Sequence, residues 1–453
     1  MNIVIVGAGK MGSELCLSLR EEGHDITLIE KNTDRLQAMM ETCDILGVAG
    51  NGAFYGVQKK SNVADCDIFI ATTAEDEINM ISCVIAKKLG AKRTVARVRT
   101  PEYAEQMSFT NDGLGISRMI NPDQEAAAEI FRMLQYPSAL SIEPFFGGRV
   151  QMVELEIIPH SYLDHLRLIE FRREFSGLIA CIVQHENDSE IPGGHTVLQA
   201  GDRLFVTGET MDMRRLYKHM GGLERIGSVM LIGGGRIARY LLEMHRKTSK
   251  HFKLIEHNEM IARDLAENFD NCEIILGDGT DQEILKEEHI GSYDCLIAMT
   301  GIDEENIILS MFANKQGVPR TITKVNRTSL LPIVQNVGIQ SFITPAKLGV
   351  TAIVRYIRSI ANASQSSNIE ALYRLNEENI EVMQFFVRPS FQAINIPLSQ
   401  IDFKEGVLIA LIVRQNELIY PTGDDIISPS DHILVVAKNL TAYDLNDILR
   451  GEE

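Results

Sequence analysis

The segment NIVIVGAGKMGSELCLSLREEGHDITLIE, residues 2–30, decides the fold of this chain. An apolar, β-branched run leads into three glycines, Gly7, Gly9 and Gly12, and a helical pattern then leads to a second apolar run that ends at Glu30. In such a segment the first glycine permits a tight turn, the second lets a pyrophosphate approach the backbone at a helix N-terminus, and the third permits close helix–strand packing. The acid at the end of the second strand can accept hydrogen bonds from an adenosine ribose. The segment predicts a βαβ unit that binds a dinucleotide, and a tight turn without a ligand is the alternative.

A second copy of this segment, SVMLIGGGRIARYLLEMHRKTSKHFKLIE, occupies residues 228–256. Gly233, Gly235, Ala238 and Glu256 stand in it where the first copy has its three glycines and its acid, at an offset of 226. Further matches follow at nearly the same offset: GNG at 50–52 with GDG at 277–279, ATTAEDEIN from 71 with AMTGIDEEN from 298, ARVR at 96–99 with TKVN at 323–326, INPDQEAAAEIF with ITPAKLGVTAIV, and 191–208 with 420–437. The chain is therefore a tandem duplication of a two-domain unit.

The order of elements predicts the fold class. Strand-sized apolar runs alternate with helical patterns in the first part of each repeat, as in a doubly wound parallel sheet, whereas short strands with Gly and Pro turns fill the second part. We predict an α/β protein with two tandem Rossmann-like sheets, each followed by a small α+β domain. The expected domains are residues 1–125, 142–225, 226–348 and 371–453. Residues 221–227 (GGLERIG) join the halves, and residues 361–368 (ANASQSSN) are interpreted as a polar linker.

Composition excludes several classes of protein. The formal charge is −18, from 44 basic and 62 acidic residues, and no basic stripe interrupts it, so a nucleic-acid partner is not expected. The longest apolar runs are strand-sized rather than about 20 residues long, and the chain enters a strand at once, so we expect a cytosolic protein. The seven cysteines are scattered without a paired spacing and are interpreted as buried free thiols, with no metal site.

The residues near the predicted site indicate which nucleotide it takes. Glu30 and Glu256 would repel a 2′-phosphate, which favours NAD or an unmodified adenine nucleotide over NADP. Arg97 and Arg99 end the fifth strand on one face and could meet phosphates together, with a solvated pair as the alternative.

The second half carries different residues at the positions of these two arginines. The counterparts are Lys324 and Asn326, so a second site would carry fewer cations. Asp76, Glu77 and Asn79, matched by 303, 304 and 306, are expected to cap the helix that follows rather than to contact the ligand.

No catalytic constellation accompanies the two glycine loops. The first nucleotide-like part holds a single histidine, His24, in a turn, the Tyr55–Lys59 spacing follows the third strand too early for a reductase, and no phosphate-binding Gly-Lys-Ser/Thr loop exists. This pattern favours a sensor without catalytic residues. A dehydrogenase whose substrate site forms between subunits is the alternative.

Motifs throughout both halves carry a family resemblance: VGAGKMG, LIE, GNG, ATTAEDEINM, ARVRTPEY, INPDQEAA and IPGGHTVLQAGDRLFVTG in the first, then GGGRIA, LGDGTD and ITPAKLG in the second. Over essentially its full length the chain resembles the tandem RCK (regulator of potassium conductance) family of TrkA-type, NAD-binding regulatory subunits of bacterial Trk potassium uptake systems. The resemblance implies nucleotide contacts at Gly7, Ala8, Gly9, Lys10, Met11, Glu30, Thr73, Arg97 and Arg99, and in the second half at Gly233, Gly234, Gly235, Arg236, Ile237, Glu256, Thr300 and Lys324.

The resemblance also implies cofactors and partners. These are NAD(H), or ATP and ADP, a homo-oligomeric ring that is expected to be a tetramer, and an integral membrane potassium transporter subunit of the TrkH type. The chain would then lie on the cytoplasmic face of the inner membrane through that partner. Because Asn326 replaces Arg99 in the second half, the phosphate contact there is in doubt.

Overall fold

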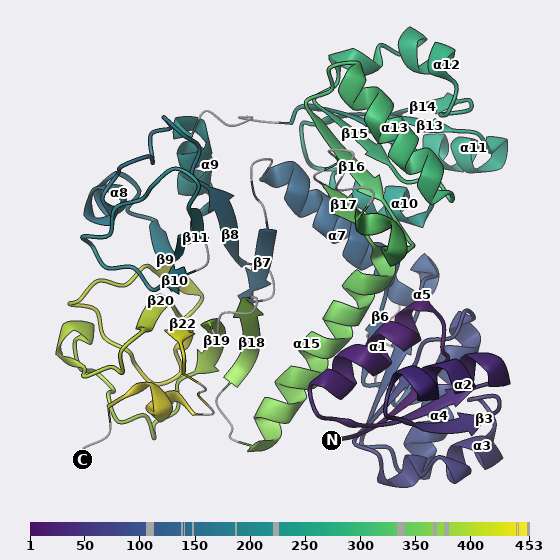
Figure 1. Ribbon diagram of the computed structural model, residues 1–453, viewed down its shortest axis with the longest axis horizontal. Helices are drawn as coiled ribbons and strands as arrows, with labels where there is room; N and C mark the ends of the chain where they lie inside the picture. Colours follow the sequence, from purple (N-terminus) through teal and green to yellow (C-terminus); the bar gives the residue numbers. More distant parts are fainter. Residues whose placement is uncertain are drawn as a thin grey trace. The chain divides into compact units, whose positions relative to one another are not determined.

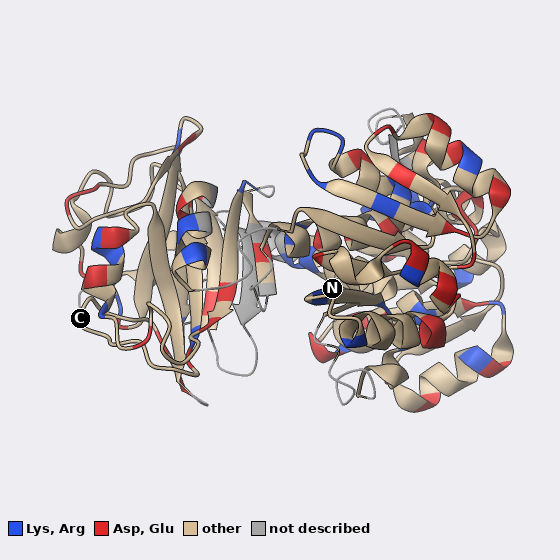
Figure 2. Ribbon diagram, turned by 90° about the horizontal axis from the view of Figure 1, so that it is seen from above, with Lys and Arg blue, Asp and Glu red and all other residues tan. Residues whose placement is uncertain are grey.

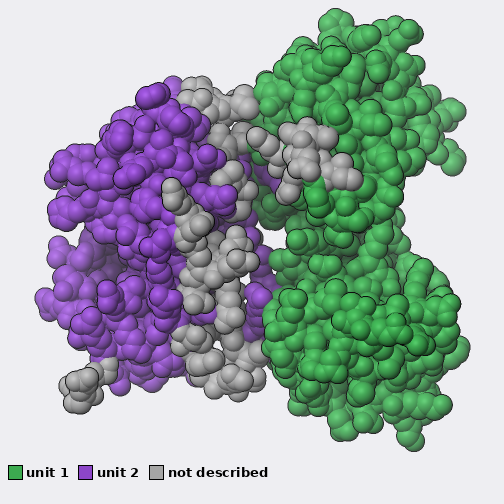
Figure 3. All heavy atoms as spheres, viewed as in Figure 1, with its two compact units in different colours: residues 1–132, 226–354 green, residues 133–225, 355–453 purple. Residues whose placement is uncertain are grey.

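The computed structural model describes residues 1–105, 113–136, 139, 141–146, 149–185, 188–220, 226–332, 339, 341–365, 369–375, 380–440, 442 and 444–450. They form two compact units, shown in Figure 3: residues 1–132 with 226–354, and residues 133–225 with 355–453. Each unit therefore combines matching parts of the two repeats. Among the described residues, no helix combines the length and the apolar character needed to cross a membrane.

The first unit contains two sheets of the same topology (Figure 1). The first sheet has the order β3-β2-β1-β4-β5-β6 and the second has the order β14-β13-β12-β15-β16-β17, with parallel pairing throughout. The strands of the first are β1 (Asn2–Val6), β2 (Asp25–Glu30), β3 (Leu46–Ala49), β4 (Ile68–Ala71), β5 (Arg93–Arg97) and β6 (Arg118–Ile120). Those of the second are β12 (Ser228–Ile232), β13 (His251–Glu256), β14 (Cys272–Leu276), β15 (Cys295–Ala298), β16 (Arg320–Lys324) and β17 (Phe342–Ile343). The predicted fold class is confirmed.

Helices connect these strands in the crossover pattern that parallel pairing requires. In the first half they are α1 (Lys10–Glu21), α2 (Thr33–Thr42), α3 (Tyr55–Lys60), α4 (Asp76–Leu89), α5 (Pro101–Glu105) and α7 (Pro122–Gln135). In the second half they are α10 (Arg236–Met244), α11 (Glu259–Asn268), α12 (Gln282–Glu287), α13 (Asp303–Lys315) and α15 (Pro345–Gln365). Figure 2 shows charged residues mainly on helices and connecting segments, while the strands are mostly uncharged, as parallel strands buried on both faces should be.

Strand register gathers the ends of three strands at one edge of the first sheet. Val6 at the end of β1 pairs with Ile29 of β2 on one side and with Ala71 of β4 on the other. The segments that leave these strands, at Gly7, Glu30 and Thr72, therefore start side by side. A ligand crevice at this carboxyl edge is the arrangement that open α/β sheets use.

The long helices α7 and α15 occupy the ends of the predicted nucleotide-like domains. Residues 125 and 348, where the sequence predicted those domains to end, lie inside these helices. The interpretation of 361–368 as a linker is wrong for residues 361–365, which continue α15, while 366–368 and most of the predicted joint at 221–227 lie outside the described residues. The helix extends because each residue added to a formed helix gains a hydrogen bond, even in a polar sequence.

The second unit contains two five-stranded sheets with antiparallel pairing, ordered β10-β9-β11-β8-β7 and β18-β19-β22-β20-β21. The two orders are the same when one is read from its other end. The elements are β7 (Ser141–Phe145), β8 (Val150–Glu156), α8 (Leu168–Glu174), β9 (Leu178–His185), β10 (Asp188–Glu190), β11 (Arg203–Gly208) and α9 (Thr210–His219), then β18 (Ile369–Leu375), β19 (Ile380–Phe386), β20 (Val407–Arg414), β21 (Glu417–Ile419) and β22 (His432–Lys438). One shared apolar cluster, including Met152 and Phe205 from one sheet and Leu411 and Leu434 from the other, packs the two sheets together.

All seven cysteines are free thiols. Six of them are buried, but Cys272 is only partly buried, so the prediction of burial is wrong at that position. Burial raises the pKa of the Cys16 thiol to about 12, which keeps it protonated and chemically inert.

We predict that Gly12→Ala destabilises the protein by about 1–3 kcal/mol, because a Cβ on Gly12 would lie 1.8 Å from the carbonyl oxygen of Gly7. Gly9→Ala is the matched control in the same loop: its Cβ would meet nothing within 4 Å, and its backbone is extended at φ −74° and ψ −176°. The control should lose less stability than Gly12→Ala, because it creates no clash and loses only the preference of the α1 N-cap for glycine over alanine. Thermal unfolding measures both, and equal losses would contradict the packing argument.

Candidate functional site

A cavity of about 610 Å3 lies at the carboxyl edge of the first sheet, a size that small-molecule and cofactor sites commonly have. Its walls come from the glycine loop, the ends of β1, β2 and β3, the segment after β4, the end of β5 and the start of α7. The lining residues are Val6, Gly7, Gly9, Lys10, Met11, Ile29, Glu30, Lys31, Arg35, Gly50, Asn51, Gly52, Thr72, Thr73, Ala74, Glu75, Ile78, Arg97, Arg99, Pro122, Asp123, Asn326, Pro345 and Ala346. Of the nine first-half residues predicted to contact nucleotide, all but Ala8 line this cavity.

The glycine loop leaves a helix start open toward the cavity. Gly7 has φ +96°, and a Cβ there would approach the Thr73 backbone to 3.3 Å, so the turn requires glycine. Gly9 is the N-cap of α1, and no side chain caps this helix start. The first N–H groups of a helix carry partial positive charge and attract anions. The loop therefore offers backbone donors to a phosphate.

Glu30 is tied to the backbone rather than left free. It is 7% exposed, and its Oε2 accepts a hydrogen bond from the Ala8 N–H at 2.5 Å while Oε1 accepts one from the Asn32 N–H at 2.9 Å. A carboxylate has about four acceptor sites, so these two bonds leave capacity toward the cavity. The acid thus braces the glycine loop as well as facing the ligand space, a structural role that the motif alone did not indicate.

Two arginines at the end of β5 form another wall. Nη1 of Arg97 donates to the Thr73 carbonyl at 2.7 Å, and Nη2 of Arg99 donates to the Ala74 carbonyl at 2.9 Å. Burial, together with the nearby charge of Arg99, lowers the pKa of Arg97 to about 10, and the guanidinium remains charged near neutral pH. The Nε atoms of both arginines are buried without a hydrogen-bond partner. Arg97 is therefore a half-buried cation beside the cavity rather than a solvated surface residue.

The prediction that Asp76 and Asn79 cap the following helix is wrong. The N-cap of α4 is Glu75, with no side-chain cap bond. Asn79 is fully buried and joins two walls of the cavity, because its Oδ1 accepts from the Thr73 N–H at 2.8 Å and its Nδ2 donates to the Arg97 carbonyl at 2.9 Å.

Asp76 has a similar positioning role at the end of the arginine strand. Its Oδ2 accepts from the N–H groups of Arg99 and Thr100, both at 2.9 Å, and from the Thr100 hydroxyl at 2.7 Å. Burial by itself would raise the pKa of Asp76, but these hydrogen bonds outweigh it and the pKa is lowered. Glu77 accepts instead from the Tyr103 hydroxyl on the surface, so it does not cap the helix either.

The second half repeats this local geometry. Gly233 has φ +101°, Glu256 accepts from the Gly234 N–H at 2.6 Å, and Nζ of Lys324 donates to the Thr300 carbonyl at 2.9 Å. Burial lowers the pKa of Lys324. Gly235 is the N-cap of α10.

Two residues of the second predicted set lie apart from this arrangement. The side chain of Ile237 is buried, and Nε of Arg236 donates to Oδ2 of Asp123, in the first half, at 2.7 Å. Arg236 is therefore joined to a residue that lines the first cavity.

The second half also contributes residues to the first cavity, which the sequence pattern did not predict. Asn326, Pro345 and Ala346 line it, although each half was expected to bind by itself. Lys31, Arg35 and the GNG segment at 50–52 were also missed. The GNG segment stood out as a repeat, and its place after the third strand could have assigned it to the carboxyl edge.

Known proteins are similar to this chain over nearly its full length. The TrkA-N domain family matches residues 3–122 and 229–345, and the TrkA-C domain family matches residues 152–221 and 382–449. The Trk system potassium uptake protein TrkA homolog of Archaeoglobus fulgidus is 32% identical over 97% of both chains, and the TrkA of Halomonas elongata is 30% identical over 96% of this chain and 95% of its own. A solved structure of the GsuK channel bound to NAD is similar with a TM-score of 0.63 at 18% identity, over 97% of this chain and 77% of that one, and this likeness concerns the fold.

We predict that Asp76→Ala lowers stability by about 1–3 kcal/mol at pH 7, because two partly buried backbone N–H groups lose their acceptor. Since the pKa of Asp76 is lowered in the folded state, its contribution is present above the ordinary aspartate pKa and is lost as the pH falls below it. The difference between wild type and Asp76→Ala, measured by denaturant unfolding, should therefore shrink below about pH 4. Glu77→Ala, at an exposed position, is the control, and a pH-independent difference at position 76 would contradict the assignment.

Proposed function

The chain belongs to the TrkA family, and on this premise we propose that it is the nucleotide-sensing subunit that controls a Trk-type potassium uptake transporter. Its relatives are named as components of potassium uptake systems, so the protein is a transport regulator and not an enzyme. The alternative of an oxidoreductase therefore receives no support.

The charge of the cavity is the main support for a phosphate-containing ligand. Five cations line it: Lys10, Lys31, Arg35, Arg97 and Arg99. Only three acids do so, and two of them are already engaged, Glu30 by backbone N–H groups and Asp123 by Arg236. In a chain of net charge −18, a local excess of positive charge is suited to a polyphosphate or dinucleotide.

We infer the following pose for NAD(H) or an adenine nucleotide. Glu30 faces the adenosine ribose, the loop from Gly7 to Met11 receives the pyrophosphate, and Arg97 and Arg99 neutralise phosphate charge. Thr73 and Ala74 carry the carbonyls that hold these arginines in place. The second half is proposed to bind more weakly, through Gly233–Gly235, Glu256, Thr300 and Lys324.

The proposed partner is an integral membrane potassium transporter subunit of the TrkH type. The names of the relatives and the likeness to a channel structure support a homo-oligomeric ring, proposed to be a tetramer, on the cytoplasmic face of the membrane. A nucleotide would control the transporter only if it bound two conformations of the ring with different affinity.

Calorimetric titration of the purified chain with NADH, NAD, ATP and ADP tests the proposed ligand class. Binding of at least one of them with affinity that falls as ionic strength rises is the expected result, since the lining is cationic. Affinity capture from detergent-solubilised membranes tests the partner. Loss of NADH absorbance with a panel of oxo-acids would instead support the oxidoreductase.

We predict that Gly9→Val abolishes nucleotide binding at the first cavity while the fold is kept. Space around a Cβ at Gly9 is open in the structure, and this is the space that a pyrophosphate would occupy. Gly235→Val is the matched control, because a Cβ there also meets nothing within 4 Å. For Gly9→Val, ligand-induced stabilisation should fall to what the weaker second site supplies, while the melting temperature without ligand is unchanged. For the control it should persist. Persistence in both variants would argue against the first cavity as the principal site.

We also predict that the double variant Arg97→Ala, Arg99→Ala weakens nucleotide binding by about 10- to 150-fold, since hydrogen bonds to charged groups contribute about 1.5–3 kcal/mol. The variant should also impair growth on limiting potassium. Lys324→Ala should do less in both assays, because a single half-buried cation stands at its site. If Lys324→Ala weakened nucleotide binding and growth more than the double variant, the second half would be the principal nucleotide site.

A further inference from the structure

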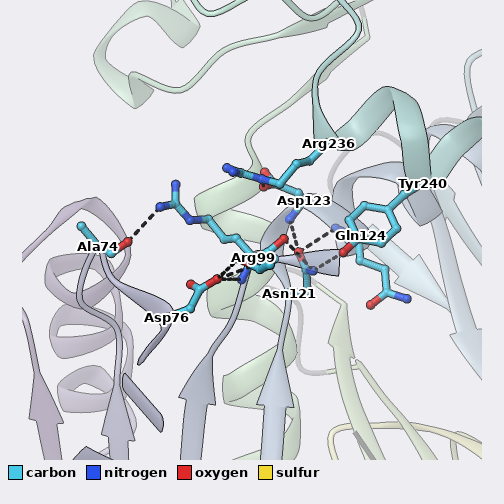
Figure 4. A network of polar contacts seen from close by, with 9 residues as sticks. Ala74, Asp76, Arg99, Asn121, Asp123, Gln124, Arg236 and Tyr240 are labelled. Atoms are coloured by element: carbon cyan, nitrogen blue, oxygen red, sulfur yellow. Dashed lines mark hydrogen bonds and ion pairs between the residues drawn. The ribbon is translucent and has the colours of Figure 1, made fainter. Parts of the chain in front are cut away.

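A partly buried hydrogen bond joins the second half of the first unit to the wall of the first cavity (Figure 4). Nδ2 of Asn121, which follows β6 and is 6% exposed, donates to the hydroxyl oxygen of Tyr240 on α10 at 2.7 Å. Burial raises the pKa of the Tyr240 hydroxyl to about 12, so it remains neutral. The contact is therefore a partly buried hydrogen bond between neutral groups, and its loss would leave the buried Asn121 amide with one partner fewer.

Asn121 is a junction between three elements. Its Oδ1 accepts from the N–H groups of Asp123 at 3.0 Å and Gln124 at 3.1 Å, which caps the start of α7. Its Nδ2 also approaches the Arg99 carbonyl at 3.4 Å. Because Arg99 and Asp123 both line the cavity, Asn121 sets the position of that wall, and Tyr240 holds Asn121.

A second contact joins the same two elements. Nε of Arg236, at the start of α10, donates to Oδ2 of Asp123 at 2.7 Å, and the side chain of this aspartate is 15% exposed. Further along, the rings of Phe131 on α7 and His245 after α10 lie 4.6 Å apart. Helix α10 therefore contacts α7 near both of its ends.

The equivalent residues of the two repeats, which the structure describes, do not form a second copy of these contacts. Asn121 and Tyr240 correspond to Thr344 and Glu14, and Asp123 and Arg236 correspond to Ala346 and Lys10. Ala346 has no side-chain acceptor for Lys10, so the reverse ion pair cannot form. Oγ1 of Thr344 is buried without a hydrogen-bond partner.

We propose that Tyr240 is a positioning residue for the first cavity: through Asn121 it fixes the wall formed by Arg99 and Asp123, and it couples nucleotide occupancy of this cavity to the second nucleotide-like domain. The inference rests on the proposed function. Such coupling is reciprocal, so a nucleotide in the first cavity stabilises α10 as much as α10 supports the nucleotide.

Tyr240→Phe tests the proposal because it removes only the hydroxyl. NADH and ATP are titrated calorimetrically into the full chain, and the variant should bind about fivefold or more weakly, as expected of a typical coupling between sites. Thr344→Val, at the position that corresponds to Asn121 in the other half, is the control and should bind within twofold of wild type. In a cycle with Arg99→Ala, the two losses should not add, since Tyr240 acts through the same wall.

Hydrogen exchange measures whether nucleotide binding protects α10, an effect that a purely structural role of Tyr240 would not produce. NADH or ATP should slow amide exchange along α10 in wild type and in Thr344→Val but not in Tyr240→Phe. Arg236→Gln breaks the contact with Asp123 and leaves Asn121 in place, so it should also reduce this protection. This variant replaces Tyr240→Phe in the experiment if Tyr240→Phe folds poorly.

If Tyr240→Phe bound nucleotide with unchanged affinity and α10 were still protected, the inference would fail while the proposed function would stand. Strictly additive losses in the cycle with Arg99→Ala would have the same consequence. If wild type bound neither NADH nor ATP, the proposed function would fail and the inference with it.

Discussion

The hydrogen bond from the Ala8 N–H to the buried Glu30 carboxylate is the constraint on which the first site depends. A buried carboxylate needs hydrogen-bond donors, and Glu30 obtains them from the glycine loop and from Asn32. The bond therefore holds the loop against the end of β2 and keeps the start of α1 open to the cavity. Glu256 repeats it with Gly234, so the same constraint shapes both halves.

The two halves share a fold but differ in chemistry. A parallel sheet with a tight strand–helix turn needs glycine at the loop and apolar strands, and both halves keep these features. It does not need a particular residue at the cavity wall, where Arg99 corresponds to Asn326 and Asp123 corresponds to Ala346. The two halves thus share one scaffold but differ at the cavity wall. The wall of the first cavity carries two arginines, Arg97 and Arg99, and hydrogen bonds to α10 of the second half.

That asymmetry gives a regulator a physical means of transmission. Ligand binding at a cavity transmits only if the protein around it is connected to another element whose position depends on occupancy. Here the wall of the first cavity is built on Asn79, Asp76 and Asn121, which connect the β4 loop, the arginine strand and α7. The contacts of Tyr240 and Arg236 carry this network into the second half.

The sequence by itself determined the repeat, the parallel sheets and the meeting of glycine loop, Glu30, Thr73 and the two arginines at one edge, because strand ends in a parallel sheet follow from the order of elements. Only the tertiary structure decided the partners of Asp76 and Asn79, the continuation of α15 through residue 365, and the entry of Asn326 and Pro345 into the first cavity. Local pattern sets which face of a strand or helix is apolar, whereas these contacts join residues on different elements or in different halves. They depend on how packed elements bring particular side chains together, and periodicity does not encode that.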